Sequence, residues 1–111
     1  ERLLHQAVLN LLENAVKYTP AGGTVRISGQ ATGCRFQIEV ADQGPGIPAD
    51  LRQRIFEPFF RVDDARSRPQ GGSGLGLALV KAIAEAHGGT IHAEDNPAGG
   101  SLFVLELPYE L

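Results

Sequence analysis

A run of glycines in the second half of the chain has the composition of a phosphate-binding segment. Residues 71–76 read Gly-Gly-Ser-Gly-Leu-Gly and directly precede a predicted helix. At a helix N-terminus, unpaired amides and the positive end of the helix dipole attract anions, and glycines let the backbone approach a phosphate closely. Glycine-serine runs are usually flexible linkers. Because this run leads into an apolar helix, we favour phosphate binding.

Two well-known phosphate motifs do not fit the chain. A P-loop requires Lys and Ser or Thr where Leu77 and Ala78 stand, and the dinucleotide fingerprint requires Gly where Leu77 stands. Residues 44–49, Gly-Pro-Gly-Ile-Pro-Ala, are a better dinucleotide candidate because they follow a predicted strand and precede a short helix. Their two prolines lack amides that a pyrophosphate would need. The sequence therefore disfavours a dinucleotide site.

Asp42 ends a predicted strand and is followed by Gln-Gly-Pro-Gly-Ile-Pro. Aspartate before such a sequence usually forms a turn. A carboxylate at this place can also accept a hydrogen bond from an exocyclic amine inside a pocket. Taken alone, Asp42 favours the turn.

Three polar residues near the start of the chain share one helical stripe. Asn10, Asn14 and Lys17 stand at i, i+4 and i+7, so a helix would stack two carboxamides and an ammonium group beside its apolar face. Asparagine is a poor residue for a helix interior. The stripe is either part of a functional site or a solvated polar face, and this helix alone does not decide between the two.

The remaining residue types exclude several kinds of chemistry. The three histidines, His5, His87 and His92, have no metal-ligand spacing, and no Ser-His-Asp arrangement is visible. We expect them at the solvent or at helix ends. The single cysteine, Cys34, has no partner within the chain for a disulfide.

The hydrophobic pattern predicts the elements that would position these residues. Spacings of three and four indicate helices, and alternation indicates strands. Helices are expected over residues 2–18, 49–55 and 75–86, the last mostly buried, and strands over 24–30, 35–40, 90–94 and 101–107. Paired strands beside helices, without regular alternation, predict an α+β fold. We expect a two-layer sandwich in which about three helices cover one face of a mixed, mostly antiparallel sheet.

Length and composition indicate one soluble domain over residues 1–111. The net charge of -3 disfavours a nucleic-acid or acidic-membrane binder. No apolar run reaches the roughly 18 residues of a membrane span, and no signal-peptide pattern opens the chain. The chain has no methionine and starts almost directly in a helix, so we expect it to be excised from a larger protein.

Four segments together resemble the catalytic, ATP-binding domain of bacterial sensor histidine kinases, in the superfamily of gyrase, heat-shock chaperones and mismatch-repair ATPases. The resemblance covers nearly the whole chain. Residues 10–18 are similar to the N box, 42–47 to the first glycine box, 56–61 to the F box and 72–77 to the second glycine box. The closing residues 99–103 are similar to the usual end of the domain, with Ser101 where Thr is commoner.

This resemblance implies Mg²⁺ and ATP as cofactors and assigns roles to the first two boxes. Asn14 would hold Mg²⁺ through its side-chain oxygen, a hard ligand for a hard cation. Asn10 and Lys17 would serve the phosphates, and Tyr18 would flank the nucleotide. Asp42 would accept from the adenine amine.

The resemblance also implies an ATP lid over residues 61–74, in which Arg61 would reach the γ-phosphate as a catalytic residue. Gly46 and Ile47 would shape the base pocket. The other implied nucleotide-binding residues are Gly44, Gly72, Gly74, Leu75, Gly76, Leu77 and Ser101.

The implied function is donation of the γ-phosphoryl group to a histidine on a separate dimerisation domain, with a response regulator as the next acceptor. The implied place is the cytoplasm, with a parent protein that can be membrane-anchored, and neither nucleic acid nor direct membrane contact is expected. Two features depart from the family. The strand that usually precedes the first helix is absent, and no histidine is followed by an acidic residue.

Two other functions stay open. ATPases of the same superfamily carry a glutamate at the position of Asn10 to activate water, and asparagine cannot act as that base. An interaction module that binds ATP without transferring phosphate would keep the same binding residues.

Overall fold

The computed structural model describes residues 2–58 and 76–108, and the lid segment predicted over 61–74 lies outside them. The elements, in chain order, are α1 (Arg2–Tyr18), β1 (Arg26–Thr32), β2 (Arg35–Ala41), the 3-10 segments η1 (Ala49–Leu51) and η2 (Arg54–Phe56), α2 (Gly76–Ala86), β3 (Thr90–Asp95) and β4 (Ser101–Pro108).

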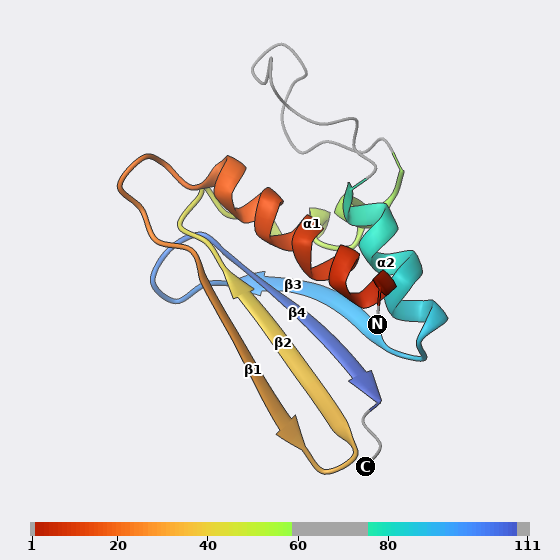
Figure 1. The fold of residues 1–111 in the computed structure, drawn as a ribbon. Coiled ribbons are helices and arrows are strands. Elements are labelled where there is room, and N and C mark those ends of the chain that lie inside the picture. Colours follow the sequence, from red (N-terminus) through yellow and green to blue (C-terminus); the bar gives the residue numbers. More distant parts are fainter. Residues whose placement is uncertain (1, 59–75, 109–111) are drawn as a thin grey trace.

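The four strands form one sheet in the order β1-β2-β4-β3, and each of the three neighbouring pairs is antiparallel. Figure 1 shows both long helices on one face of this sheet, with α1 lying across it and α2 beside α1. The predicted α+β sandwich is thus confirmed, except that the described sheet is antiparallel throughout where a mixed, mostly antiparallel one was expected. The strands β2 and β4 occupy the middle of the sheet, so the segments that follow β2 and precede β4 meet at one end.

The core lies between β4 and the helices. Directly paired residues of an antiparallel sheet share a face, so Phe103 of β4 and Val40 of β2 point to the same side. Both are fully or almost fully buried, as is Leu11 of α1. Burying one such side chain contributes about 1.5–3 kcal/mol. Phe56 of η2 packs edge to face on Phe103, with ring centroids 6.3 Å apart and planes at 87°, and this contact anchors the start of the F box.

The sequence predicts a mostly buried helix over residues 75–86. The helix is confirmed, but the prediction that it is mostly buried is wrong. The buried residues of α2 are Val80, Ile83 and Ala84, while Leu79 is 44% exposed. The helix contacts α1, η2, β3 and β4, and its buried residues are spaced three and four positions apart, as on one side of a helix. A composition that is apolar all round therefore does not mean burial all round.

The single short helix predicted over 49–55 is not formed. The chain forms the two 3-10 segments η1 and η2 there. Short helices depend on packing for their stability, and within η1 and η2 only Ile55 and Phe56 are buried.

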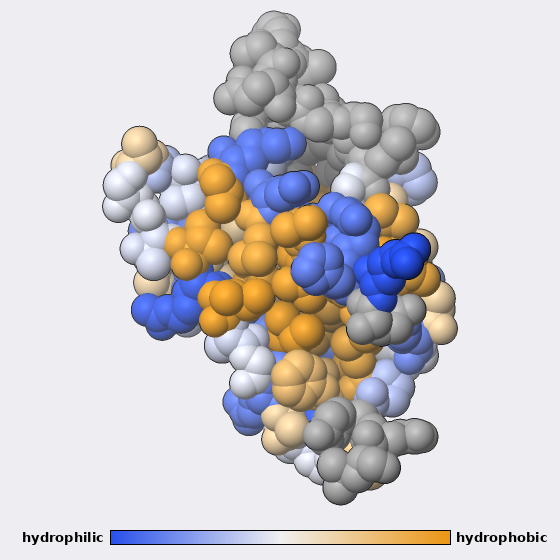
Figure 2. All heavy atoms as spheres, in the orientation of Figure 1, coloured by the Kyte–Doolittle hydropathy of each residue, from blue (hydrophilic) through white to orange (hydrophobic). Residues whose placement is uncertain are grey.

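The strand β1 forms one exposed edge of the sheet. All seven residues of β1 are exposed, and the strand lies two residues later than predicted. The hairpin turn is Gly33 and Cys34, with Gly33 at φ +60°, a conformation that glycine adopts without strain. Figure 2 shows that apolar side chains gather over the middle of the helical face.

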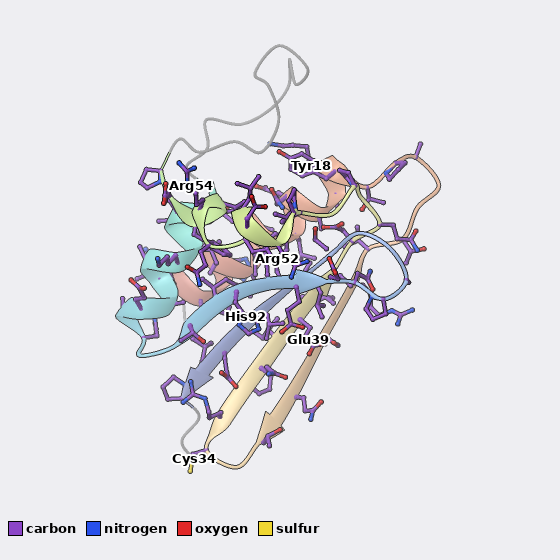
Figure 3. The ribbon with its side chains drawn as sticks, turned by 180° about the vertical axis from the view of Figure 1, so that it is seen from behind. Tyr18, Cys34, Glu39, Arg52, Arg54 and His92 are labelled. Atoms are coloured by element: carbon purple, nitrogen blue, oxygen red, sulfur yellow. The ribbon has the colours of Figure 1, made fainter. Side chains whose placement is uncertain are left out.

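The opposite face of the sheet is polar. Figure 3 views this side, where Glu39 of β2 and His92 of β3 are labelled, with β4 between the two strands. His92 Nε2 lies 2.7 Å from Oε2 of Glu94. Among the described residues no helix is long and apolar enough to cross a membrane, and no three His, Cys, Asp or Glu side chains are grouped as metal ligands.

Candidate functional site

The loop after β2 is packed closely against the end of α1. A Cβ placed on Gly44 would lie 2.7 Å from the carbonyl oxygen of Tyr18, closer than a β-carbon can approach a backbone oxygen. The amide of Gln43 donates to Oγ1 of Thr19 at 3.2 Å, and Oε1 of Gln43 accepts from the amide of Thr24 at 2.9 Å. These contacts bring the end of the N box beside the first glycine box.

Asp42 is the most buried charged side chain among the described residues, at 2% exposure. Its Oδ1 accepts from the amide of Gly44 at 2.9 Å and from the amide of Ser101 at 3.1 Å. Its own amide donates to the carbonyl oxygen of Ser101 at 2.9 Å, and its carbonyl oxygen accepts from Nδ2 of Asn96 at 2.8 Å. The prediction that Asp42 forms a turn is therefore confirmed, and Oδ1 is the oxygen that forms it.

The second carboxylate oxygen of Asp42, Oδ2, accepts no hydrogen bond from the described residues. No fully buried side-chain oxygen or nitrogen in the described ranges lacks a partner. Oδ2 must therefore keep a narrow opening to the surface. One carboxylate thus holds the loop with one oxygen and offers the other as a hydrogen-bond acceptor.

The predicted stripe on α1 exists, since α1 runs unbroken from Arg2 to Tyr18. Asn10 is already engaged: its Oδ1 accepts from Gln6 at 2.9 Å, and its Nδ2 lies 3.5 Å from the carbonyl oxygen of Gly76. Asn14 is half-buried and makes no side-chain hydrogen bond within the described part of the chain. Nζ of Lys17 lies 5.8 Å from the centre of the Tyr18 ring.

The start of α2 faces this stripe. Gly76 is the first residue of α2 and is exposed, and outside the helix backbone a Cβ there would meet no described atom within 4 Å. Leu77 is half-buried and packs against the core. The described part of the fold therefore does not require glycine at position 76. The predicted residues Arg61, Gly72, Gly74 and Leu75 lie outside the described residues.

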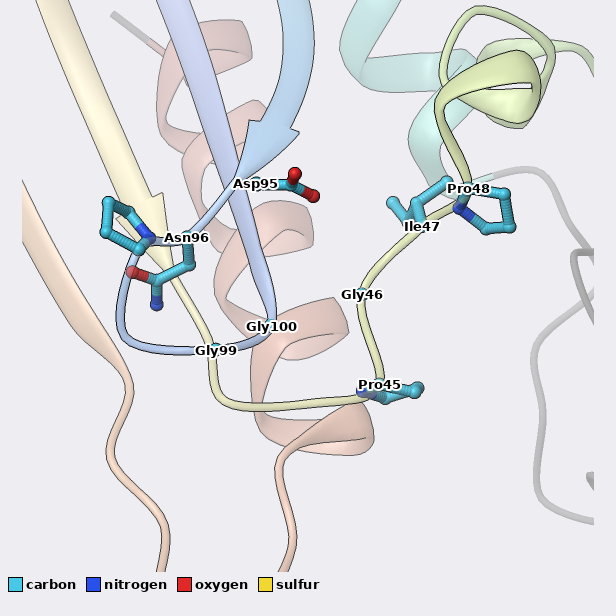
Figure 4. Close-up of a pocket in the computed structure, with 9 residues that line it drawn as sticks. Pro45, Gly46, Ile47, Pro48, Asp95, Asn96, Gly99 and Gly100 are labelled. Carbon is cyan, nitrogen blue, oxygen red and sulfur yellow. The ribbon is translucent and has the colours of Figure 1, made fainter.

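Gly46 and Ile47 line an open groove of about 640 Å³. The groove separates residues 45–48 from the β3–β4 turn, as Figure 4 shows, and its other lining residues are Asp95, Asn96, Pro97, Gly99 and Gly100. Asp42 and Asn14 do not line it. The groove therefore lies beside, and is not the same as, the space offered by Oδ2 and the α1 stripe.

Sequence reasoning missed three residues that hold the loop. Gln43 ties it to Thr19 and Thr24, Asn96 holds the carbonyl of Asp42, and Arg52 donates from Nε to the carbonyl oxygen of Ile47 at 3.3 Å. Arg52 also pairs through Nη2 with Oδ1 of Asp95 at 2.6 Å. Gln43 adjoins Asp42 in the sequence, whereas no local pattern indicates the other two.

Comparison with known proteins agrees with this architecture. The family model described as histidine kinase-, DNA gyrase B-, and HSP90-like ATPase matches residues 1–111. The sensor-like histidine kinase SenX3 of Mycolicibacterium smegmatis is 49% identical over 108 residues, which cover 97% of this chain and 28% of that protein. The chain therefore spans little more than a quarter of this curated relative.

Solved structures give the same result. The mycobacterial sensor histidine kinase MprB superposes with a TM-score of 0.84 at 39% identity, over 96% of this chain and 70% of that one. Full-length ShkA, solved in complex with AMPPNP, superposes with a TM-score of 0.81 at 40% identity, over 96% of this chain and 21% of that one. The chain belongs to the histidine kinase-, DNA gyrase B- and HSP90-like ATPase family, as the catalytic ATP-binding domain of a histidine kinase.

Proposed function

We propose that this domain binds Mg-ATP and donates the γ-phosphoryl group to a histidine on a separate dimerisation domain. The single observation that carries the nucleotide proposal is Oδ2 of Asp42, the one polar atom of that buried residue that no described group occupies. A carboxylate oxygen accepts hydrogen bonds only, so it matches the 6-amino group of adenine. Ser101 supports the role by orienting the carboxylate from its backbone amide.

The phosphates would lie between α1 and the start of α2. Lys17 supplies a positive charge on α1, and Gly76 opens α2 with amides that have no intrahelical partner. Because no described atom outside the helix backbone lies within 4 Å of the Cβ position of Gly76, a phosphate could approach its backbone closely. Tyr18, which adjoins both Lys17 and Gly44, would flank the nucleotide.

Asn14 fits the role of magnesium ligand. Its carboxamide is half-buried on the same stripe as Lys17 and forms no hydrogen bond to the described residues, whereas that of Asn10 is engaged. A neutral oxygen ligand suits Mg²⁺, which usually keeps several waters. When bound, the metal would neutralise charge on the phosphates.

One feature favours transfer to a protein over hydrolysis, and a second indicates where the acceptor would be. Asn10 stands where the superfamily ATPases carry their glutamate, and a carboxamide cannot deprotonate water. None of the three histidines precedes an acidic residue, so the acceptor would be supplied by another domain. Arg61 would stabilise the transferring group, and a response regulator would take the phosphoryl group next.

Radiolabelled ATP tests the proposal. The chain alone should bind ATP without labelling itself or releasing phosphate at an appreciable rate. Addition of a histidine-bearing dimerisation domain from the same parent protein should produce label on that domain, because transfer needs an acceptor placed in line. Rapid phosphate release by the chain alone would instead favour the ATPase function, and binding without any transfer would favour the interaction module.

A further inference from the structure

The side chain of Asn96 connects the β3–β4 turn to the backbone of Asp42. Asn96 directly follows β3, and its Nδ2 donates to the carbonyl oxygen of Asp42 at 2.8 Å. At the other end of the same carboxamide, Oδ1 accepts from the amide of Ala98 at 3.1 Å. One partner is an acceptor and the other a donor, so only one orientation of the carboxamide satisfies both.

The rest of the turn is also pressed against Asp42. The amide of Asn96 donates to the carbonyl oxygen of Gly100 at 3.1 Å, which closes the turn. Gly100 has φ +101°, and a Cβ there would collide with the carbonyl oxygen of Asp42. Asn96 thus reaches Asp42 from a turn whose backbone already touches it.

The same turn reaches the other end of the first glycine box. Asp95, the last residue of β3, pairs with Nη2 of Arg52, and Nε of Arg52 donates to the carbonyl oxygen of Ile47. The loop is therefore held at Asp42 by Asn96 and at Ile47 through Arg52. Figure 4 shows the turn facing the loop across the groove.

We infer that Asn96 is a positioning residue for adenine selection, acting through the main chain of Asp42. The inference rests on the proposed function, in which Oδ2 of Asp42 accepts from adenine. The Asn96 bond holds the one backbone atom of Asp42 that Ser101 and Gly44 leave unpaired. Hydrogen bonds weaken steeply with misalignment, so a small shift of this backbone changes the contact with the adenine amine more than the phosphate contacts.

Two substitutions separate the donation to Asp42 from the stability of the turn. Asn96→Asp keeps an oxygen for the amide of Ala98 but places its other oxygen against the carbonyl of Asp42. Asn96→Ser also keeps a short acceptor for Ala98 and adds no charge, and its hydroxyl is one bond too short to reach the carbonyl oxygen of Asp42. Gly99→Ala is the control: Gly99 has φ +100° and open space around its Cβ position, so alanine strains the same turn while leaving Asn96 intact.

The measurement is calorimetric titration of each variant with ATP and with inosine triphosphate, which carries a carbonyl oxygen in place of the 6-amino group. We expect both Asn96 variants to lower the preference for ATP by about fivefold, the equivalent of one ordinary hydrogen bond. Gly99→Ala should keep the wild-type preference within about twofold. The charge added by Asn96→Asp acts on both nucleotides alike and cancels in the ratio.

The outcomes are distinct. Equal losses for both nucleotides, or no loss, in the Asn96 variants would show that Asn96 only supports the fold and would overturn the inference. A wild-type chain that binds ATP and inosine triphosphate equally would remove Asp42 from adenine recognition and Asn96 with it. A wild-type chain that binds neither nucleotide would overturn the proposed function itself.

Discussion

Asp42 and Ser101 are joined by two hydrogen bonds across 59 positions of sequence: the amide of Asp42 donates to the carbonyl oxygen of Ser101 at 2.9 Å, and the amide of Ser101 donates to Oδ1 of Asp42 at 3.1 Å. The pair locks the end of β2 to the start of β4. It also means that the carboxylate has a structural task and a proposed binding task on different oxygens, so its truncation to alanine would disturb both.

Asp42→Asn separates the two tasks. The asparagine can keep an oxygen at the position of Oδ1 for the amides of Gly44 and Ser101, while its NH₂ group replaces Oδ2. A donor there would face the 6-amino group of adenine but match the 6-oxo group of inosine or guanine. We expect calorimetry to show ATP affinity falling by at least about tenfold, since a mispaired polar group in a pocket costs about 1–3 kcal/mol, while inosine triphosphate binds as well as before or better.

The matched comparison is Asp42→Ala, which leaves the two backbone amides without their acceptor. It should lower the thermal stability of the chain as well as ATP affinity. If Asp42→Asn keeps the wild-type preference for ATP over inosine triphosphate and GTP, the adenine role of Asp42 is wrong.

Periodicity and turn residues predict elements where burial follows a local pattern. The span of α1 was predictable from its apolar spacing and from Pro20, which ends it, and the strand β2 from its alternation. Residues 49–55 were not, because their few buried positions show no helical period. The exposure of Leu79 depends on how α2 sits beside α1, and no local pattern encodes that.

In the candidate site, too, some residues could be predicted from a local pattern and others could not. Asp42 was recognisable because it lies within a distinctive run of glycines and prolines. Asn96 and Arg52 act on partners 54 and 43 positions away, so their importance becomes visible only when the sheet brings β3 beside the loop. Sequence patterns identify residues that would contact the ligand more readily than the residues that hold them in place.

The core contact of η2 gives a stability prediction. Phe56→Ala should lower the free energy of unfolding by about 3–5 kcal/mol, because it leaves a cavity beside Phe103. Leu79→Ala, on the exposed side of α2, should cost less than about 1 kcal/mol. Urea denaturation followed by circular dichroism measures both. A large loss for Leu79→Ala would mean that this side of α2 is packed in solution.

Gly76 allows a test in which stability and binding move in opposite directions. Outside its own helix backbone, alanine there meets no described atom within 4 Å and is the better helix former, so Gly76→Ala should raise the free energy of unfolding by up to about 1 kcal/mol. If a phosphate lies against this backbone, the added methyl group should weaken ATP binding. Unchanged ATP affinity in the stabilised variant would remove Gly76 from the phosphate site.

The magnesium role of Asn14 predicts a loss that depends on the metal. Asn14→Ala removes no hydrogen bond within the described residues and improves helix propensity, so α1 should be as stable as before or slightly more so. In the wild-type chain we expect ATP to bind more tightly with Mg²⁺ than with a chelator present. The variant should lose about tenfold or more of that metal-dependent gain, while its affinity in chelator stays the same. Glu13→Ala, a change at the exposed neighbouring position of the same helix, is the control and should keep the full gain. If the variant at position 14 still responds to Mg²⁺ like the wild type, the metal is held by other residues. If ATP binding is weakened equally with and without Mg²⁺, Asn14 contacts the nucleotide directly.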